Sequence, residues 1–178
     1  MIALKALIMK YLLLVITLLF GSTMSAEEPA YDLVIRNGRV IDGTGNPWFH
    51  ADVAIKDGTI VALKRVLEES GRREIDAQGM VVAPGFIDMH SHSDYLLLED
   101  GDALSKIHQG VTTEILGEGN SAGPNQGKRT ARSATVNGKT VRWKTLGEYF
   151  QILEKAGIST NVASYVGLNN AWEAAMGK

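Results

Sequence analysis

The sequence predicts an α/β protein, in which a small antiparallel sheet is followed by strand–helix units of a parallel sheet. Short runs of alternating residues rich in Val and Ile occupy residues 31–63 and are interrupted by Asn-Gly and Asp-Gly. From residue 84 onwards, strand-like segments alternate with helical patterns. The 178 residues are 45% hydrophobic and 21% charged, which is the composition of a folded globular protein.

The first 26 residues have the pattern of a secretory signal peptide. Lys5 and Lys10 precede the apolar run YLLLVITLLF, and small residues surround the expected cleavage point near Ser25 or Ala26. The apolar run is short for a membrane span. We therefore expect an exported protein, periplasmic or secreted, with no stable membrane span after cleavage. An uncleaved membrane anchor is the alternative.

Charge and cysteine content exclude several classes of partner and chemistry. Residues 1–26 contain two of the 18 basic residues and none of the 20 acidic ones, so the remaining chain has a net charge of about −4. Nucleic acid is therefore excluded as a partner, because binding to phosphates needs a basic surface. The chain has no cysteine, which excludes disulfides, thiol nucleophiles and thiolate metal ligands.

Residues 31–63 are expected to form two consecutive β-hairpins. One pair of alternating segments flanks Asn37-Gly38, and a second pair flanks Asp57-Gly58. Both dipeptides favour the positive φ angles of two-residue hairpin turns. A further extended segment, MVVAPGF, leads into the next part of the chain.

The C-terminal half predicts the alternation of a parallel sheet. GDALSKIHQG predicts a short helix closed by Gly110, and VTTEILG predicts a strand. Residues 121–144, rich in small and polar side chains, predict a long loop. Thr145 and Glu148 have the spacing of a capping box before an amphipathic helix that Gly157 ends. STNVASYVG predicts a further strand and AWEAAMG a further helix.

The segment GFIDMHSHSD places two histidines one residue apart at the end of an apolar run. In an extended strand His90 and His92 share a face with Phe86 and Asp88, and their Cα atoms lie about 6 to 7 Å apart. Two imidazoles at that spacing can bind one metal ion at about 2.1 Å from each nitrogen. The alternative is a pair of surface or hydrogen-bonded histidines where a strand meets a loop.

A second strand ends in a carboxylate that could complete this site. In VTTEILGEG, Glu114 and Glu118 share a face, and Glu118 lies at the C-terminal end, where parallel barrels carry their chemistry. Geometry therefore favours Glu118 as a metal ligand, with a solvated loop acid as the alternative. For Glu114 a structural charge between elements is the better interpretation. His108 is expected at a helix C-terminus, and the basic run GKRTAR in a solvated loop.

Four segments together resemble the N-terminal part of the amidohydrolase superfamily, and more narrowly the N-acyl-D-amino-acid deacylases or D-aminoacylases: YDLVIRNGRVIDGTG, VVAPGFIDMHSHSD, GVTTEILGEG and NVASYVG. The resemblance implies a small β-sandwich portion over residues 27–83 and the first βα units of an incomplete TIM-like barrel over residues 84–178. It also implies one or two Zn²⁺ ions with His90 and His92 as ligands, and a small-molecule N-acyl amino acid as substrate.

The chain departs from the family pattern at two positions. Family members often carry Gly-Asn-Cys-Gly after the second barrel strand, with the cysteine as a metal ligand, whereas this chain has Gly119 at that place and Glu118 one residue earlier. A hard carboxylate could replace the soft thiolate on zinc. Leu168 stands where many relatives have histidine.

The expected function is that of a hydrolase acting on carbon–nitrogen bonds other than peptide bonds. In the family the general base is an aspartate on a late barrel strand, so we expect it beyond Lys178. A complete barrel takes about 250 residues, and the chain is therefore expected to be part of a longer enzyme or a truncated gene product, inactive alone. The alternatives are a dihydropyrimidinase-like cyclic amidase and a non-catalytic exported binding module.

Overall fold

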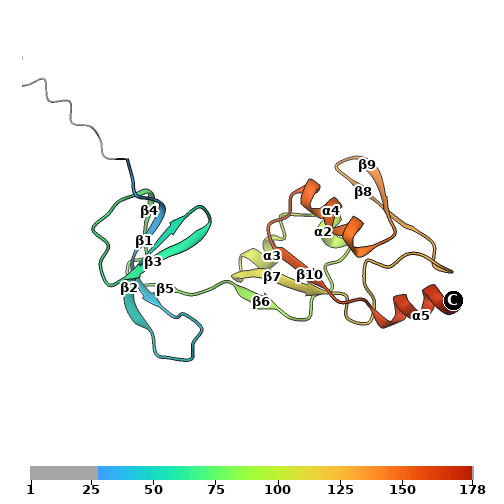
Figure 1. Ribbon diagram of the computed structural model, residues 1–178, viewed down its shortest axis with the longest axis horizontal. Helices are drawn as coiled ribbons and strands as arrows, with labels where there is room; N and C mark the ends of the chain where they lie inside the picture. The colour runs from blue at the N-terminus through green and yellow to red at the C-terminus, as the bar shows by residue number, and fades with distance from the viewer. Residues whose placement is uncertain (1–27, 178) are drawn as a thin grey trace, which may run out of the picture. The chain divides into compact units, whose positions relative to one another are not determined.

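A computed structural model describes residues 28–177 (Figure 1). The chain divides into two compact units, which we call the first unit, ending at Ala83, and the second unit, beginning at Pro84. The predicted signal peptide, residues 1–26, lies outside the described residues. No helix in the described part of the chain is long and apolar enough to cross a membrane.

The first unit is a five-stranded mixed sheet with strand order β3-β2-β1-β4, in which β5 also pairs with β1. β2 runs antiparallel to β1 and β3, whereas β4 and β5 run parallel to β1. The predicted antiparallel arrangement of residues 31–63 is confirmed, whereas the sequence pattern did not indicate β4 and gave no direction for β5. The strands are β1 (Tyr31–Val40), β2 (Phe49–Lys56), β3 (Thr59–Lys64), β4 (Gly71–Asp76) and β5 (Val81–Val82).

Only the second of the two predicted hairpins exists. Asp57 and Gly58, with φ angles of 49° and 70°, form the two-residue turn between β2 and β3, which confirms that prediction. Asn37 also has a positive φ, 57°, but it lies within the continuous strand β1, where the register against β2 shifts. Its backbone N–H donates to Asp52 Oδ1 at 2.9 Å. The predicted first hairpin is wrong because Asn37-Gly38 forms a bulge instead.

The second unit contains a three-stranded parallel sheet with strand order β10-β7-β6 (Figure 1). Helices separate the strands along the chain, which confirms the predicted α/β class. The strands are β6 (Phe86–Asp88), β7 (Val111–Leu116) and β10 (Asn161–Ser164), and the helices are α2 (Leu96–Glu99), α3 (Leu104–Ile107), α4 (Leu146–Ala156) and α5 (Leu168–Met176).

The predicted long loop over residues 121–144 contains a β-hairpin formed by β8 (Arg132–Val136) and β9 (Lys139–Trp143). Asn137 and Gly138, with φ angles of 49° and 74°, make its turn. The loop prediction is wrong because it followed composition and overlooked Asn-Gly between two alternating segments. The hairpin belongs to the core, since Trp143 is fully buried.

Helix α4 supplies much of the core of the second unit. Glu148 N donates to Thr145 Oγ1 at 3.1 Å, and Thr145 N donates to Glu148 Oε2 at 3.2 Å, which confirms the predicted capping box. The buried face of α4 presents Tyr149 and Leu153 to a cluster that includes Leu116 at the end of β7. Full burial of a side chain such as Leu153 contributes about 1.5–3 kcal/mol. This packing fixes the strand ends that carry the polar residues described next.

Candidate metal centre

His90 and His92 lie immediately beyond the C-terminal end of β6. The strand ends at Asp88, and the histidines follow in a bend and an irregular segment. The prediction that both lie within an extended strand is therefore wrong. The segment nevertheless stays beside the sheet, because Ser91 N donates to Ile115 O of β7 at 3.0 Å.

The two imidazole rings face each other. His90 Nε2 and His92 Nε2 are 2.9 Å apart, and the ring centroids are 4.8 Å apart with an interplanar angle of 72°. A tetrahedral zinc ion at about 2.1 Å from each nitrogen needs the nitrogens about 3.4 Å apart, which a small ring movement provides. The His90 side chain is 60% exposed, so an ion has access to this pair.

Glu118 contacts the opposite edge of His90. Its Oε2 atom lies 2.6 Å from His90 Nδ1, whereas Nε2 of the same ring faces His92. A carboxylate in this place favours one tautomer and orientation of an imidazole. The structure thus brings all three predicted residues together, with Glu118 beside His90 and away from the facing Nε2 atoms.

These three side chains do not surround a single point. Within residues 28–177, no group of three or more His, Cys, Asp or Glu side chains is arranged to hold a metal ion. The donors that converge are the two imidazole nitrogens of His90 and His92. The role of Glu118 as a third ligand stays a prediction.

Hydrogen bonds of Asp88 connect the start of the histidine segment, residues 88–94, to α3. Its Oδ1 atom accepts a hydrogen bond from His90 N at 3.1 Å, and its Oδ2 atom lies 2.5 Å from Lys106 Nζ. The hydrogen bond with Lys106 lowers the pKa of Asp88 and raises the pKa of Lys106. The sequence placed Asp88 on the histidine face but gave no sign of this partner, which requires the packing of α3 on the sheet.

Asp94 ties the other end of the segment to the core. Its Oδ1 atom accepts from Ala122 N at 3.2 Å, and its backbone carbonyl accepts from Tyr149 Oη at 2.5 Å. Burial raises the pKa of Asp94 and that of Tyr149. Both ends of the histidine segment are therefore fixed by hydrogen bonds to other elements.

Glu114 lies beneath the segment, and its side chain has no solvent exposure. It accepts hydrogen bonds from Ser91 Oγ and Ser93 Oγ, both at 2.6 Å, and from Thr160 Oγ1 at 2.9 Å; Lys106 Nζ lies 3.6 Å away. Burial raises the pKa of Glu114, but these hydrogen bonds outweigh it and leave the pKa lowered. This confirms the interpretation of Glu114 as a structural charge between elements.

Two other residues singled out in the sequence lie at helix ends. His108 is the C-cap residue of α3, which confirms its expected place at a helix C-terminus. Leu168 is the first residue of α5 and is strongly exposed. Neither contacts the histidine pair through a hydrogen bond or ion pair in the described part of the chain.

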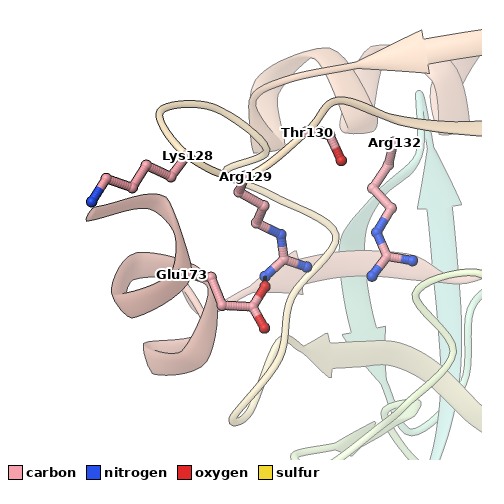
Figure 2. A pocket seen from close by; sticks show the side chains of 5 residues that line it. All are labelled: Lys128, Arg129, Thr130, Arg132 and Glu173. Carbon is pink, nitrogen blue, oxygen red and sulfur yellow. Dashed lines mark ion pairs between the residues drawn. The ribbon is translucent and has the colours of Figure 1, made fainter. Parts of the chain in front are cut away.

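The basic run predicted to be solvated lines a pocket in the second unit (Figure 2). Arg129 is only 8% exposed; its Nη1 atom lies 2.9 Å from Glu173 Oε2, and its Nε atom donates to Asn125 Oδ1 at 3.1 Å. Nη1 is close to Glu173 without the geometry of a hydrogen bond. The Arg132 guanidinium lies 5.3 Å from the ring centroid of Tyr95. The prediction of a solvated loop is wrong for Arg129, which links this loop to α5.

Comparison of the sequence with known proteins identifies related enzymes. A family model described as "Amidohydrolase family" matches residues 73–156. The N-acyl-D-glutamate deacylase of Alcaligenes xylosoxydans xylosoxydans is 38% identical over 148 residues, which is 82% of this chain and 30% of that protein.

Comparison of the fold with solved structures finds enzymes of the same kind. The N-acyl-D-glutamate deacylase from Bordetella bronchiseptica, in complex with zinc and a phosphonate mimic of the tetrahedral intermediate, has a TM-score of 0.72 and 37% identity, and the match covers 83% of this chain and 32% of that chain. A D-aminoacylase studied for its binuclear metal centre has a TM-score of 0.67 and 32% identity, again over 83% and 32%. The chain thus spans about a third of the length of the proteins that it matches.

Proposed function

We propose that this chain, which resembles part of the N-acyl-D-glutamate deacylases in sequence and fold, supplies part of the metal site of an enzyme that hydrolyses the amide bond of N-acyl-D-amino acids. The observation that carries the proposal is the pair of facing Nε2 atoms of His90 and His92, 2.9 Å apart at the carboxyl end of β6. The edge formed by the carboxyl ends of parallel strands is where enzymes of this architecture place their chemistry.

The donors of the histidine pair suit zinc. Neutral imidazole nitrogen is among the preferred ligands of Zn²⁺, and the rings of His90 and His92 converge through the same ring atom. Glu118 Oε2 lies 2.6 Å from His90 Nδ1, and a carboxylate in this place favours the tautomer with the proton on Nδ1, whose Nε2 lone pair is free to bind the ion. The proposal covers one or two ions. It assigns the other ligands and the general base to the part of the relatives that has no counterpart in this chain.

The residues of this chain have distinct tasks in the proposed reaction. A bound zinc ion would supply Lewis-acid polarisation of the amide carbonyl and would lower the pKa of a coordinated water towards about 7. His90 and His92 would hold the ion, Glu118 would favour the required tautomer of His90, and Asp88 accepts a hydrogen bond from the backbone N–H of His90. The chain by itself is expected to have no deacylase activity.

Zinc titration of the purified chain tests the metal site. Isothermal titration calorimetry is expected to show binding to the wild-type chain and a loss of at least about 100-fold in affinity in H90A and H92A, because each removes one of two donors. H50A is the matched control, since His50 lies in the first unit and faces Trp48. Equal zinc affinity in H90A, H92A and H50A would contradict the proposal and favour the non-catalytic binding module.

A chimera tests the link to hydrolysis. Residues 31–176 would replace the matching part of the Alcaligenes N-acyl-D-glutamate deacylase, and release of D-glutamate from N-acetyl-D-glutamate would be measured. We expect activity in the chimera and its loss in the H90A and H92A versions. A folded chimera that is equally active with and without the two imidazoles would show that the histidine pair has no part in the reaction.

We also propose that the protein is exported. Support comes from the first 26 residues, with Lys5 and Lys10 ahead of an apolar run and small residues after it. Cell fractionation should find the full chain in the periplasm or medium and a variant lacking residues 1–26 in the cytoplasm. N-terminal sequencing of the exported form should locate cleavage near Ala26, and an intact Met1 on an exported, membrane-bound chain would support the anchor instead.

A further inference from the structure

The two histidines alternate along the chain with two serines that bind one buried carboxylate. Ser91 Oγ and Ser93 Oγ both donate to Glu114 Oε2 at 2.6 Å, and the two hydroxyls are 2.8 Å apart. Both serines contact Glu114, whereas the histidines that alternate with them meet each other through their Nε2 atoms.

Glu114 is itself held from several directions. It lies on β7, the central strand of the parallel sheet, and is completely buried. Thr160, the residue before β10, donates to its second oxygen, Oε1, at 2.9 Å. Lys106 of α3 balances its charge at 3.6 Å. A buried carboxylate with this set of partners has little freedom to move, so it is a rigid anchor for the two serines.

The same charge network reaches the backbone of the first histidine. Lys106 Nζ lies 2.5 Å from Asp88 Oδ2, and Asp88 Oδ1 accepts from His90 N at 3.1 Å. The segment is thus connected to Glu114 twice, directly through serine hydroxyls and indirectly through Lys106 and Asp88. No hydrogen bond or ion pair joins Glu114 to either imidazole in the described structure.

Resting on the proposed function, we propose that Glu114 is a positioning residue for the metal site, which holds Ser91 and Ser93 so that the imidazoles of His90 and His92 face each other. Side chains that orient metal ligands through hydrogen bonds contribute about 10- to 100-fold to metal affinity. Glu114 has no hydrogen bond to either imidazole in the described structure and would act through Ser91 and Ser93, which alternate with the histidines along the chain.

The test compares zinc affinity and ring geometry in E114Q and the wild-type chain. Glutamine has the shape of glutamate, but its amide nitrogen cannot accept a hydroxyl proton and its side chain cannot balance Lys106. The dissociation constant for Zn²⁺, measured by competition with a chromophoric chelator, should rise about 10- to 100-fold. Long-range ¹H–¹⁵N NMR spectra of the metal-free protein should show changed Nε2 environments for both histidines.

The double variant S91A/S93A removes the contact with Glu114 by changing the serines instead of the carboxylate. It keeps the buried charge and its partners Lys106 and Thr160, and we expect it to weaken zinc binding in the same direction as E114Q. Because both sets of changes weaken the contact between Glu114 and the two serines, their effects on zinc affinity should be less than additive in the combined variant. If E114Q does not fold, S91A/S93A decides the question.

Two controls separate positioning from general loss of stability. L153A weakens the core of the second unit and removes none of the hydrogen bonds of the histidine segment, and D52N alters a buried carboxylate of the first unit. Both should retain the wild-type zinc dissociation constant and histidine spectra while folded. A dissociation constant in E114Q or S91A/S93A equal to that in L153A, with unchanged ring spectra, would overturn the inference.

Failure of the inference is distinguishable from failure of the proposed function. A wild-type chain that does not bind zinc contradicts the proposed function. In that case the ¹⁵N spectra of the metal-free proteins still decide whether Glu114 sets the orientation of His90 and His92. Altered spectra in E114Q support the positioning role, and unchanged spectra contradict it.

Discussion

Each unit of the molecule contains a buried carboxylate that links several elements, Asp52 in the first unit and Glu114 in the second, and the two have different kinds of partners. Asp52 in the first unit accepts hydrogen bonds from the backbone N–H groups of Asn37 and Leu67, at 2.9 and 3.0 Å, and pairs with Arg36. Glu114 in the second unit accepts from three side-chain hydroxyls and pairs with Lys106. Asp52 therefore fixes the course of the backbone, whereas Glu114 fixes side chains in the segment that carries the metal-binding histidines.

The contrast indicates how a structural carboxylate and a site-supporting carboxylate can be told apart. Asp52 has no hydrogen bond to a residue of the candidate site in the described structure, so its loss should affect folding of the first unit and leave the site unchanged. Loss of Glu114 should affect both the stability of the second unit and the site. Four substitutions test this difference, taken in order of decreasing effect.

The largest effect is expected for E114A. It leaves the hydroxyls of Ser91, Ser93 and Thr160 without their acceptor, and Lys106 loses one partner, at a cost of about 3 kcal/mol. Hydrogen exchange followed by mass spectrometry should show faster exchange in β7 and β10, with unchanged protection in β1 and β2. Faster exchange spread equally over both units would contradict the independence of the two anchors.

A smaller effect is expected for D52N. The asparagine oxygen can still accept from one backbone N–H, but the charge opposite Arg36 is lost, so we expect a destabilisation of about 1–2 kcal/mol. Urea unfolding followed by exchange protection in β1 should measure it. Unchanged zinc affinity in D52N would support the claim that Asp52, unlike Glu114, has no part in the site. Weakened zinc binding would contradict that claim.

A substitution in the second unit away from the histidines should lower stability without changing zinc affinity, as D52N does, whereas E114A should change both. T145A removes the side-chain cap of α4, which costs about 1 kcal/mol. The thermal midpoint should fall with no change in zinc affinity. A change in zinc affinity here would mean that any weakening of the second unit disturbs the site.

The smallest effect is expected from Glu74 on acidification. The hydrogen bond from Arg36 lowers the pKa of Glu74 from 4.5 to about 2. A carboxyl whose pKa is lower in the folded state contributes stability above its unfolded pKa, and this contribution is lost as the pH falls. Urea midpoints of wild type and E74Q should therefore differ at pH 7 and converge between about pH 4.5 and 2. Because Glu74 lies at the surface, added salt should reduce the difference; a constant difference down to pH 2 would contradict this origin.

Local rules predicted the features that depend on neighbouring residues. The capping box at Thr145 and Glu148, the turn at Asp57-Gly58 and the shared side of His90 and His92 depend on spacing within a few residues. Asn37-Gly38 shows the limit of such rules, because the same dipeptide makes a bulge in β1 and a hairpin turn between β8 and β9. Whether an Asn-Gly dipeptide makes a bulge or a hairpin turn depends on the strands that pair around it.

The support of the candidate site could not be predicted in this way. Ser91, Ser93 and Thr160 are common polar residues, and only the register of β7 with β6 and β10 brings their hydroxyls to Glu114. The contact of Glu118 with Nδ1, on the far edge of His90, likewise depends on how the chain turns after β7. Sequence spacing identified the residues of the site, and the tertiary fold determined which atoms meet.

The most direct test of the account is X-ray absorption spectroscopy on the zinc-loaded chain. The extended fine structure should show two imidazole nitrogens at about 2.0–2.1 Å from zinc, and this imidazole scattering should diminish in H90A and H92A but persist in H50A. Zinc surrounded only by oxygen ligands, with no imidazole scattering in the wild-type chain, would contradict the central claim that His90 and His92 form half of a metal site.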